Sequence, residues 1–166
     1  LALYLPLLLF IGFLAMVGKG LLTPKDETVK SALIGKKMPD FELIRGDDEE
    51  AQAEVLASAD IIDPNGPVLV NFLASWCIPC VAEAPSLARL DQKGIKIYGV
   101  AVRDDYLSVE KFLKRNGDPY QNIGLDQQGK TQLSFGSAGI PETFVIDSQG
   151  IVRYQLIGPV NDDNIE

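Results

Sequence analysis

Histidine is absent from this sequence of 166 residues. Its absence excludes imidazole as a general base, as the partner of a nucleophilic cysteine, and as a ligand for zinc or haem iron. Positive charge is also scarce, since 15 Lys and Arg face 23 Asp and Glu and leave a formal net charge of −8. Nucleic acid is therefore not an expected partner, because phosphate binding depends on clustered basic side chains.

Cysteine is nearly as scarce as histidine, with two residues in the chain, Cys77 and Cys80. They are separated by only two positions, and they are the groups best suited to covalent chemistry near neutral pH. A hydrophobic content of 46% over this length is enough for one domain with a proper core, but not for two full domains beside a membrane segment. We expect one domain with accessory segments.

The beginning of the chain is strongly apolar. Residues 1–17 carry no charge, and with Leu21 and Leu22 beyond Lys19 the stretch approaches the ~20 residues that cross a bilayer. We expect a membrane anchor over residues 1–22. A cleaved signal peptide is the alternative, but its apolar region is usually ~7–15 residues long and ends at an A-x-A site, which is missing here. The lysines that follow do not settle the orientation of the span.

Residues 23–32 are polar and predict a linker, so the domain is expected over residues 33–166. Residues 47–60 are acidic and rich in alanine, which indicates an exposed loop or a short helix. At the end of the chain, residues 161–164 are types that cap a helix, and we expect a C-terminal helix to start there and to be cut short at the last residue.

Apolar periodicity places strands and helices alternately along the domain. Two runs are apolar enough for central strands covered on both faces, and two segments have helical spacing, the second capped by Ser108 and stopped by Gly117. A final pair of strands is joined by a turn at residues 147–150. This order predicts an α/β domain with a mixed central β-sheet flanked by helices. The predicted strands are residues 39–44, 67–73, 95–102, 143–146 and 151–157, and the helices are residues 77–90 and 108–116.

The cysteines lie in the sequence Trp76-Cys77-Ile78-Pro79-Cys80, where a buried strand passes into a helix. Two cysteines three positions apart in a first helical turn can form a disulfide. The helix dipole favours a thiolate at Cys77, which makes Cys77 the expected nucleophile and Cys80 the resolving thiol. Pro79 fits an early helical position, and together with Ile78 it affects how well the thiolate is stabilised.

Three other interpretations of the cysteine pair are open. A purely structural disulfide would constrain the unfolded chain little, because it closes a very small ring. A metal site would lack ligands, because zinc takes four and no histidine is available. The cysteines could also be buried bystanders, which the neighbouring Trp76 and the position at a helix start disfavour. No cofactor other than a redox-active Cys77–Cys80 disulfide is expected.

Two motifs carry a resemblance to a known family. The segment at residues 70–80, Val-Asn-Phe-Leu-Ala-Ser-Trp-Cys-Ile-Pro-Cys, resembles the strand and active site of thioredoxin-like proteins. The segment at residues 139–147, Gly-Ile-Pro-Glu-Thr-Phe-Val-Ile-Asp, resembles the part of that superfamily that carries a cis-proline. With the apolar N-terminus and Asp126-Gln-Gln-Gly129, the Pro-Glu-Thr-Phe sequence is similar to the thiol:disulfide interchange proteins of cytochrome c maturation, the DsbE or CcmG type.

The resemblance implies a thioredoxin-like fold and a function. The domain would lie on the periplasmic side of the inner membrane, held by a single N-terminal transmembrane helix. It would receive electrons from a membrane thiol reductase and reduce the disulfide of apocytochrome c, in its C-x-x-C-H motif, before haem attachment. A reductase of another pathway or of general periplasmic thiol repair is the nearest alternative. A non-catalytic module that binds unfolded clients is a second alternative, and a thiol peroxidase is disfavoured because its usual motif is missing.

By position, the resemblance also implies roles for single residues. Cys77 would be the attacking thiol, Cys80 the resolving thiol and Pro141 the cis-proline, with Glu83 and Glu142 as acids around the site. Glu83 follows Cys80 by three positions on the predicted helix, so its carboxylate could accept the proton of the buried thiol. A solvated surface carboxylate is the equally weighted alternative for Glu83.

Two further residues are expected next to the site. Asn71 occupies the strand position where general thioredoxins place a buried acid, and because an amide cannot accept a proton, a relay would need another group. Trp76 either packs in the core or forms a platform beside the sulfur, and its position next to Cys77 favours the platform.

Overall fold

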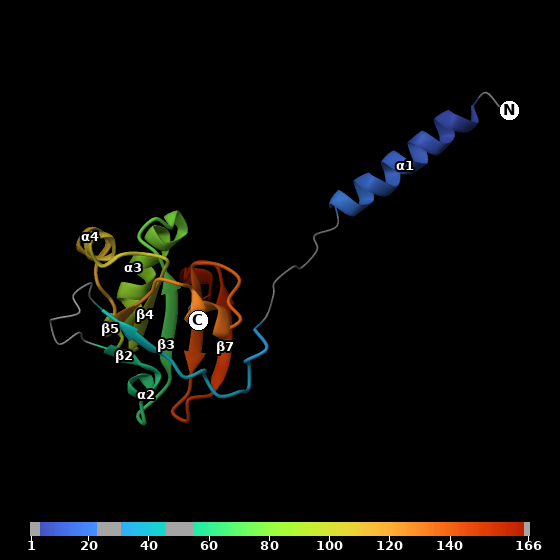
Figure 1. Ribbon diagram of the computed structural model, residues 1–166. Coiled ribbons are helices and arrows are strands. Elements are labelled where there is room, and N and C mark those ends of the chain that lie inside the picture. Colours follow the sequence, from blue (N-terminus) through green and yellow to red (C-terminus); the bar gives the residue numbers. More distant parts are fainter. Residues whose placement is uncertain (1–3, 23–30, 46–54, 165–166) are drawn as a thin grey trace.

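The computed structural model describes residues 4–22, 31–45 and 55–164, without the side chains of residues 8 and 19–22. The first helix, α1 (Leu5–Leu22), stands apart from the rest of the chain in Figure 1. In these described parts, no helix is long and apolar enough to cross a membrane. The predicted linker at residues 23–32 falls mostly outside the described residues. The contacts of the domain begin at Ser31, which is buried.

The domain is built on a five-stranded mixed sheet in the order β5-β4-β3-β6-β7, which confirms the predicted α/β architecture. Strand β3 is central, with β4 parallel to it on one side and β6 antiparallel on the other. β5 extends the parallel half, and β7 pairs antiparallel with β6. The strands are β3 (Val68–Leu73), β4 (Ile97–Val102), β5 (Asn122–Asp126), β6 (Glu142–Ile146) and β7 (Val152–Ile157).

Shorter elements complete the domain. An antiparallel pair of strands, β1 with β2, contacts β5 beside the main sheet. The longest helix of the domain, α3, follows β3 directly, and α4 follows β4 (Figure 1). The elements are β1 (Glu42–Ile44), β2 (Val55–Ala57), α2 (Ser58–Ile61), α3 (Ile78–Gln92), α4 (Tyr106–Asn116), α5 (Lys130–Ser134) and the 3-10 turn η1 (Asp162–Asn164).

The two faces of the sheet bury different kinds of side chain because residues alternate along each strand. On one face, which we call the aromatic face, Val70 and Phe72 of β3 join the rings of Phe41, Phe135 and Phe144 in one hydrophobic cluster. Four ring pairs in this cluster have centroids 5.1–6.0 Å apart, at tilted or edge-to-face angles. The cluster fixes the sheet against α5 and the segment that precedes β1.

The opposite face is covered by α3 and α4, and we call it the network face because a polar network lies within it. Leu73 and Ala101 pack there against Val109 and Phe112 of α4, in the same cluster as the two cysteines. Asn71 of β3 points to this face, directly opposite Thr143 of β6 in the strand register. The end of β3 therefore delivers the cysteines to the network face.

Most predicted elements are confirmed with shifts of a few residues at their ends. The prediction for residues 47–60 was wrong in part, because Val55–Ala57 forms β2 by pairing with β1, and residues 46–54 lie outside the described residues. The predicted cap of α4 was also wrong. Asp105 caps this helix, since its carboxylate accepts the backbone N–H of Ser108 at 2.9 Å and the Ser108 hydroxyl at 2.7 Å.

The end of the chain was predicted to start a helix. The described residues there form only the single 3-10 turn η1, and residues 165 and 166 lie outside the described residues. Asn164 donates its side-chain amide to the carbonyl of Pro159, and its carboxamide oxygen accepts the N–H of Asn161 at 2.8 Å. The asparagines thus close a local turn.

Candidate active site

The cysteine pair lies at the first turn of α3, as the sequence predicted. Cys77 is the N-cap residue of the helix, with Pro79 just inside it, and a disulfide joins Cys77 to Cys80 with 5.3 Å between the Cα atoms. The sulfur of Cys77 accepts the backbone N–H of Cys80 at 3.3 Å. This donor and the positive end of the helix dipole both stabilise negative charge on Cys77 when the disulfide is reduced.

Exposure differs sharply around the disulfide. Cys77 and Cys80 are 4% and 2% exposed, whereas Ile78 is 83% exposed and Trp76 is 60% exposed. Core packing is therefore excluded for Trp76, whose indole N–H donates to the carbonyl of Arg103 at 3.3 Å. Two exposed apolar side chains therefore flank the buried Cys77, and such a surface is suited to contact with another polypeptide.

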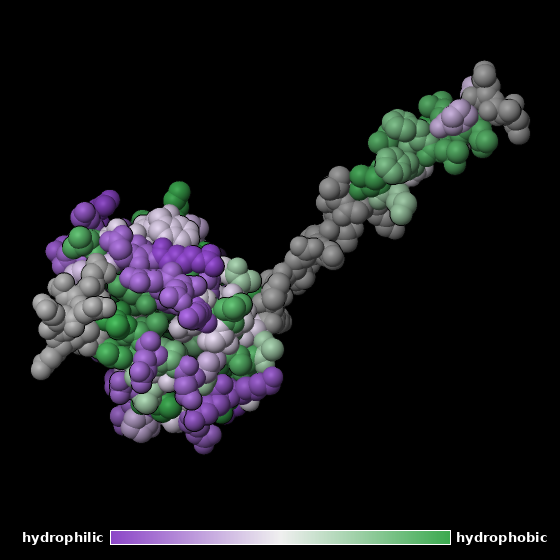
Figure 2. All heavy atoms as spheres, viewed as in Figure 1, coloured by the Kyte–Doolittle hydropathy of each residue, from purple (hydrophilic) through white to green (hydrophobic). Residues whose placement is uncertain are grey.

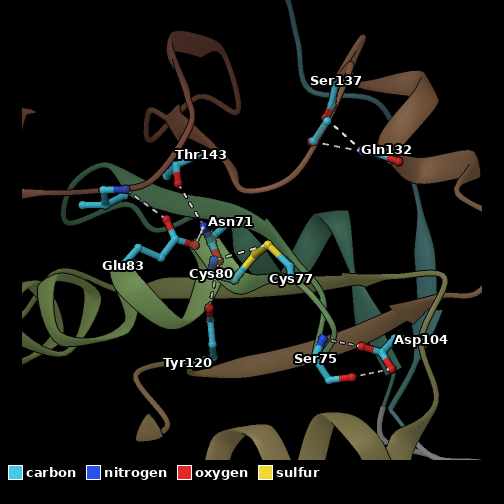
Figure 3. Close-up of a disulfide and its surroundings, with 12 residues drawn as sticks. Asn71, Ser75, Cys77, Cys80, Glu83, Asp104, Tyr120, Gln132, Ser137 and Thr143 are labelled. Carbon is cyan, nitrogen blue, oxygen red and sulfur yellow. Dashed lines mark hydrogen bonds between the residues drawn. A yellow bond between two sulfur atoms is a disulfide. The ribbon is translucent and has the colours of Figure 1, made fainter.

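Asp104 fixes the chain just before the cysteines. Its carboxylate accepts the backbone N–H of Ser75 at 2.5 Å and the Ser75 hydroxyl at 3.0 Å, as Figure 3 shows. These bonds tie the loop after β4 to the turn that leads into α3. Asp104 thus holds the chain segment that leads to Cys77.

A hydrogen-bonded network lies behind Cys80 on the network face (Figure 3). Asn71 is at its centre and is 0% exposed. Its amide donates to Glu83 at 3.1 Å and to the Thr143 hydroxyl at 3.0 Å, and its carboxamide oxygen accepts the Tyr120 hydroxyl at 2.8 Å. The second oxygen of Glu83 accepts the N–H of Val160 at 3.0 Å. Every polar group of Asn71 and Glu83 shown here has a partner.

Burial decides the protonation of Glu83, which is 1% exposed. Desolvation raises the pKa of its carboxyl from 4.5 to about 7, while the hydrogen bonds from Val160 and Asn71 oppose the rise. A group with this pKa can exchange a proton near neutral pH. The solvated surface alternative for Glu83 was wrong, because the first turns of α3 face the sheet at this position. Burial likewise raises the pKa of Tyr120 well above 10.

Pro141 directly precedes β6, and Glu142 is the first residue of this strand. The Ile140–Pro141 peptide bond is cis, the conformation that the resemblance implied. Glu142 is 1% exposed and faces the aromatic face, where its carboxylate accepts the side-chain amide of Gln155 at 2.7 Å. Desolvation raises the pKa of Glu142, and the side chains of Ser137 and Gln155 and the backbone of Ala138 oppose the rise. Its atom Oε2 is buried without a partner among the described residues.

The structure thus brings all nine predicted site residues to the ends of β3 and β6 and the start of α3, but it separates the two acids. Glu83 lies on the network face and Glu142 on the aromatic face. Four further residues of the site were not predicted from the sequence, namely Tyr120, Asp104, Thr143 and Gln155. Of these, only Thr143 had a usable signal, since pairing of the predicted strands could set it opposite Asn71. Within the described residues, no group of acidic and cysteine side chains could hold a metal ion.

The Cys-x-x-Cys disulfide lies at the start of a helix in a mixed-sheet domain, and a cis-proline precedes the antiparallel strand β6. Together these features define a thioredoxin-fold thiol:disulfide oxidoreductase. Its redox centre is the cysteine pair, with no cofactor. Residues 33–166 match the Redoxin family model, and the chain belongs to that family.

Curated relatives agree with this class over nearly the whole chain. The chain is 40% identical to the thiol:disulfide interchange protein HelX of Rhodobacter capsulatus, over 98% of this chain and 89% of the relative. It is 38% identical to the thiol:disulfide interchange protein DsbE of Pseudomonas aeruginosa, over 96% of this chain and 85% of the relative. A solved DsbE structure from Chlorobium tepidum is 28% identical with a TM-score of 0.61, covering 82% of this chain and 91% of that chain.

Proposed function

We propose that this chain is a membrane-anchored periplasmic reductase that opens the disulfide of apocytochrome c, in its C-x-x-C-H motif, before haem is attached. The observation that carries the proposal is the Cys77–Cys80 disulfide at the start of α3, combined with the Pro-Glu-Thr-Phe sequence that begins with cis-Pro141. A membrane thiol reductase would return electrons to the cysteine pair. The similarity to HelX and DsbE supports the thiol:disulfide part of the proposal.

The chemistry begins from the reduced pair. The Cys77 thiolate attacks one sulfur of the client disulfide, and the other client sulfur leaves as a thiolate that takes up a proton. Cys80 then loses its proton and attacks the sulfur of Cys77. The mixed disulfide breaks, the client leaves with both thiols reduced, and the Cys77–Cys80 disulfide forms again. Two electrons have passed from the pair to the client.

Glu83 is the proposed acceptor for the Cys80 proton. Both residues are buried on the network face, and the pKa of Glu83 near 7 matches a proton acceptor that works at neutral pH. Asn71 orients the Glu83 carboxylate through its amide, and Tyr120 in turn orients Asn71. Glu83 thus accepts the proton, while Asn71 and Tyr120 hold its carboxylate in orientation.

Membrane attachment through residues 1–22 is part of the proposal. Residues 1–17 carry no charge, and the described side chains of α1 are apolar and exposed, including Leu9, Phe13 and Met16. Figure 2 shows hydrophobic residues over much of this helix. Extraction of membranes with carbonate tests the anchor, which should keep the full chain in the pellet and release a chain that begins at residue 23. Release of the full chain would contradict it.

The proposed client is tested by trapping. A Cys80→Ala variant expressed in the source cells cannot release its mixed disulfide, and the proteins linked to Cys77 can be identified, with Cys77→Ala as the control. Apocytochrome c bearing C-x-x-C-H is the expected adduct. A broad set of secreted proteins would replace the proposal with general thiol repair. No adduct at all would indicate a binding module, which would also keep its function when both cysteines are changed to serine.

A further inference from the structure

A hollow of about 360 Å³ opens beside the disulfide, between the loop after β4, α5 and the segment before Pro141. Trp76, the neighbour of Cys77, lines one end, and Ile140, the neighbour of Pro141, lines another part. Gln132 and Ser137, which Figure 3 places together on one side of the site, also line it. The hollow is therefore continuous with the surface from which a client reaches Cys77.

The charge of this hollow is opposite to that of the whole chain. Arg103 and Lys130 line it, and none of the residues that line it is acidic, although the chain has a net charge of −8. Throughout the described ranges, no ion pair involves either of these two side chains, whereas Lys96 and Lys114, for example, are paired with acids. Two cations are thus left available to a carboxylate from outside the domain.

The backbone holds Arg103 in place. Its N–H donates to the carbonyl of Asp126 at 3.0 Å, and its carbonyl accepts the indole N–H of Trp76. Arg103 has a φ of 50°, an unfavourable value for a residue with a side chain, and these two bonds hold it there. A Cβ atom added at Gly129 would lie 3.3 Å from Nε of Arg103, so glycine leaves room for the guanidinium. The backbone of Arg103 is therefore fixed at the edge of the hollow.

Apolar surface accompanies the charge. Leu133 is 77% exposed and Trp76 is 60% exposed, and both line the hollow. Large exposed apolar side chains that gather beside a reactive group indicate a protein contact surface. A partner that covers them must be apolar at some positions and acidic at others.

We infer that this hollow binds an extended client segment next to the client's reactive cysteine, and that Arg103 and Lys130 select segments carrying Asp or Glu. The inference rests on the proposed function as a disulfide reductase and adds a preference among clients to it. Trp76 and Leu133 cover an apolar side chain of the same segment, and the two cations bind its carboxylates. The hollow sets which disulfides are reduced quickly, and the cysteine pair performs the reduction.

The test compares three synthetic peptides with an internal Cys-x-x-Cys disulfide. They differ only in the residues that flank the cysteines on each side, which are Glu, Gln or Lys. The rate at which the reduced protein opens each disulfide is measured for the unchanged chain and for a variant with Arg103→Gln and Lys130→Gln. Lys93→Gln is the control, because it removes one positive charge at the far end of α3, outside the hollow.

We expect the unchanged chain to reduce the Glu peptide about fivefold faster than the Gln peptide, because two exposed ion pairs stabilise the complex by a small amount each. The Lys peptide should be reduced most slowly. The preference should fall at high salt and disappear in the double variant, but persist in the Lys93→Gln control. Equal rates for the three peptides, or a preference that survives in the double variant, would overturn the inference and leave the reductase intact. Failure to reduce any peptide would instead count against the proposed function.

Discussion

The two faces of the sheet differ in what they bury next to the same disulfide. Phe72 and Asn71 are neighbours on β3, but Phe72 packs in a cluster with three other aromatic rings and Asn71 points into a network of polar groups. Both side chains are 0% exposed. The aromatic rings need no hydrogen-bond partners, so their packing contributes to the stability of the fold. The network face instead places ionisable groups behind the reactive cysteines.

The two buried acids make the same contrast on a smaller scale. Glu83 has hydrogen bonds to both carboxylate oxygens, from Asn71 and Val160. Glu142 has one oxygen bonded to Gln155 and the other without a partner in the described parts of the chain. Gln155 in turn accepts the backbone N–H of Ser31 at 2.6 Å. Glu142 is therefore tied to the start of the domain, and Glu83 to the centre of the sheet.

The largest expected effect concerns the aromatic face. Replacing Phe135, which is 0% exposed and contacts three other rings, by Ala should lower the free energy of unfolding by about 3–5 kcal/mol, because a large cavity opens. Urea denaturation measures this, with Leu107→Ala as the control, since that side chain is 57% exposed and should cost less than about 0.5 kcal/mol. A Phe135→Ala variant as stable as the control would refute the structural role of this face.

The second effect is a pH dependence set by the network face. The pKa of Glu83 is 4.5 when unfolded and about 7 when folded, so the folded state binds more protons between these values. Stability should be highest near pH 4.5, fall as pH rises to about 7, and stay low above it, by roughly 3 kcal/mol in total from Glu83. The raised pKa of Glu142 acts in the same direction.

Urea denaturation of the oxidised protein at pH 5 and at pH 8 measures this fall. Carboxyls with lowered pKa values, such as those of Asp63, Asp105 and Asp147, act in a separate window below about pH 4. Glu83→Gln provides the control, because it removes the titrating group and should remove most of the fall. A stability that rises from pH 5 to pH 8 would contradict the protonation assigned to Glu83.

A third test exchanges each buried acid for its amide. At pH 5 the Glu83 carboxyl is protonated, but both of its oxygens can still accept hydrogen bonds. In Glu83→Gln the NH₂ group cannot accept the bond from Asn71 or from the N–H of Val160, so we expect a cost of about 2 kcal/mol at pH 5. In Glu142→Gln the NH₂ group can take the place of Oε2, which accepts no hydrogen bond, and only the contacts of the carboxyl with Ser137 and Ala138 change, so the cost should be smaller, at about 1 kcal/mol. Equal costs would show that the two acids are held alike.

The sequence predicted the central strands, α3 and the cysteine site because each follows from local patterns. Continuous apolar runs mark β3 and β4, and the short Cys-x-x-Cys spacing marks the redox centre. The membrane anchor remains a prediction. β5 was missed because Gly124 interrupts its apolar run, and the reason for this glycine is tertiary. The side chain of Leu43 from β1 lies where a Cβ atom would be.

The network itself was missed for the same reason. Asn71 and Glu83 were predicted from the motif, but their partners come from separate parts of the chain. Tyr120 lies in the loop before β5, and Val160 lies after β7. No periodicity relates these positions, since only the folded sheet brings them together. The burial of Glu83 depends on the same contacts. From the sequence alone, burial and exposure of this side chain therefore had equal weight.

The smallest expected effect isolates one bond of the network. Tyr120→Phe removes the hydroxyl that Asn71 accepts and leaves the carboxamide oxygen of Asn71 without that partner, so we expect a loss of about 1 kcal/mol. Tyr106→Phe is the matched control, because Tyr106 packs against the same hydrophobic cluster with no hydrogen bond from its hydroxyl in the described residues. Thermal and urea unfolding of both variants give the difference. If the two variants lose the same amount, the Tyr120 hydroxyl contributes nothing beyond packing. If only Tyr120→Phe is destabilised, the orientation of Asn71, and through it of Glu83, depends on a residue from outside the motif.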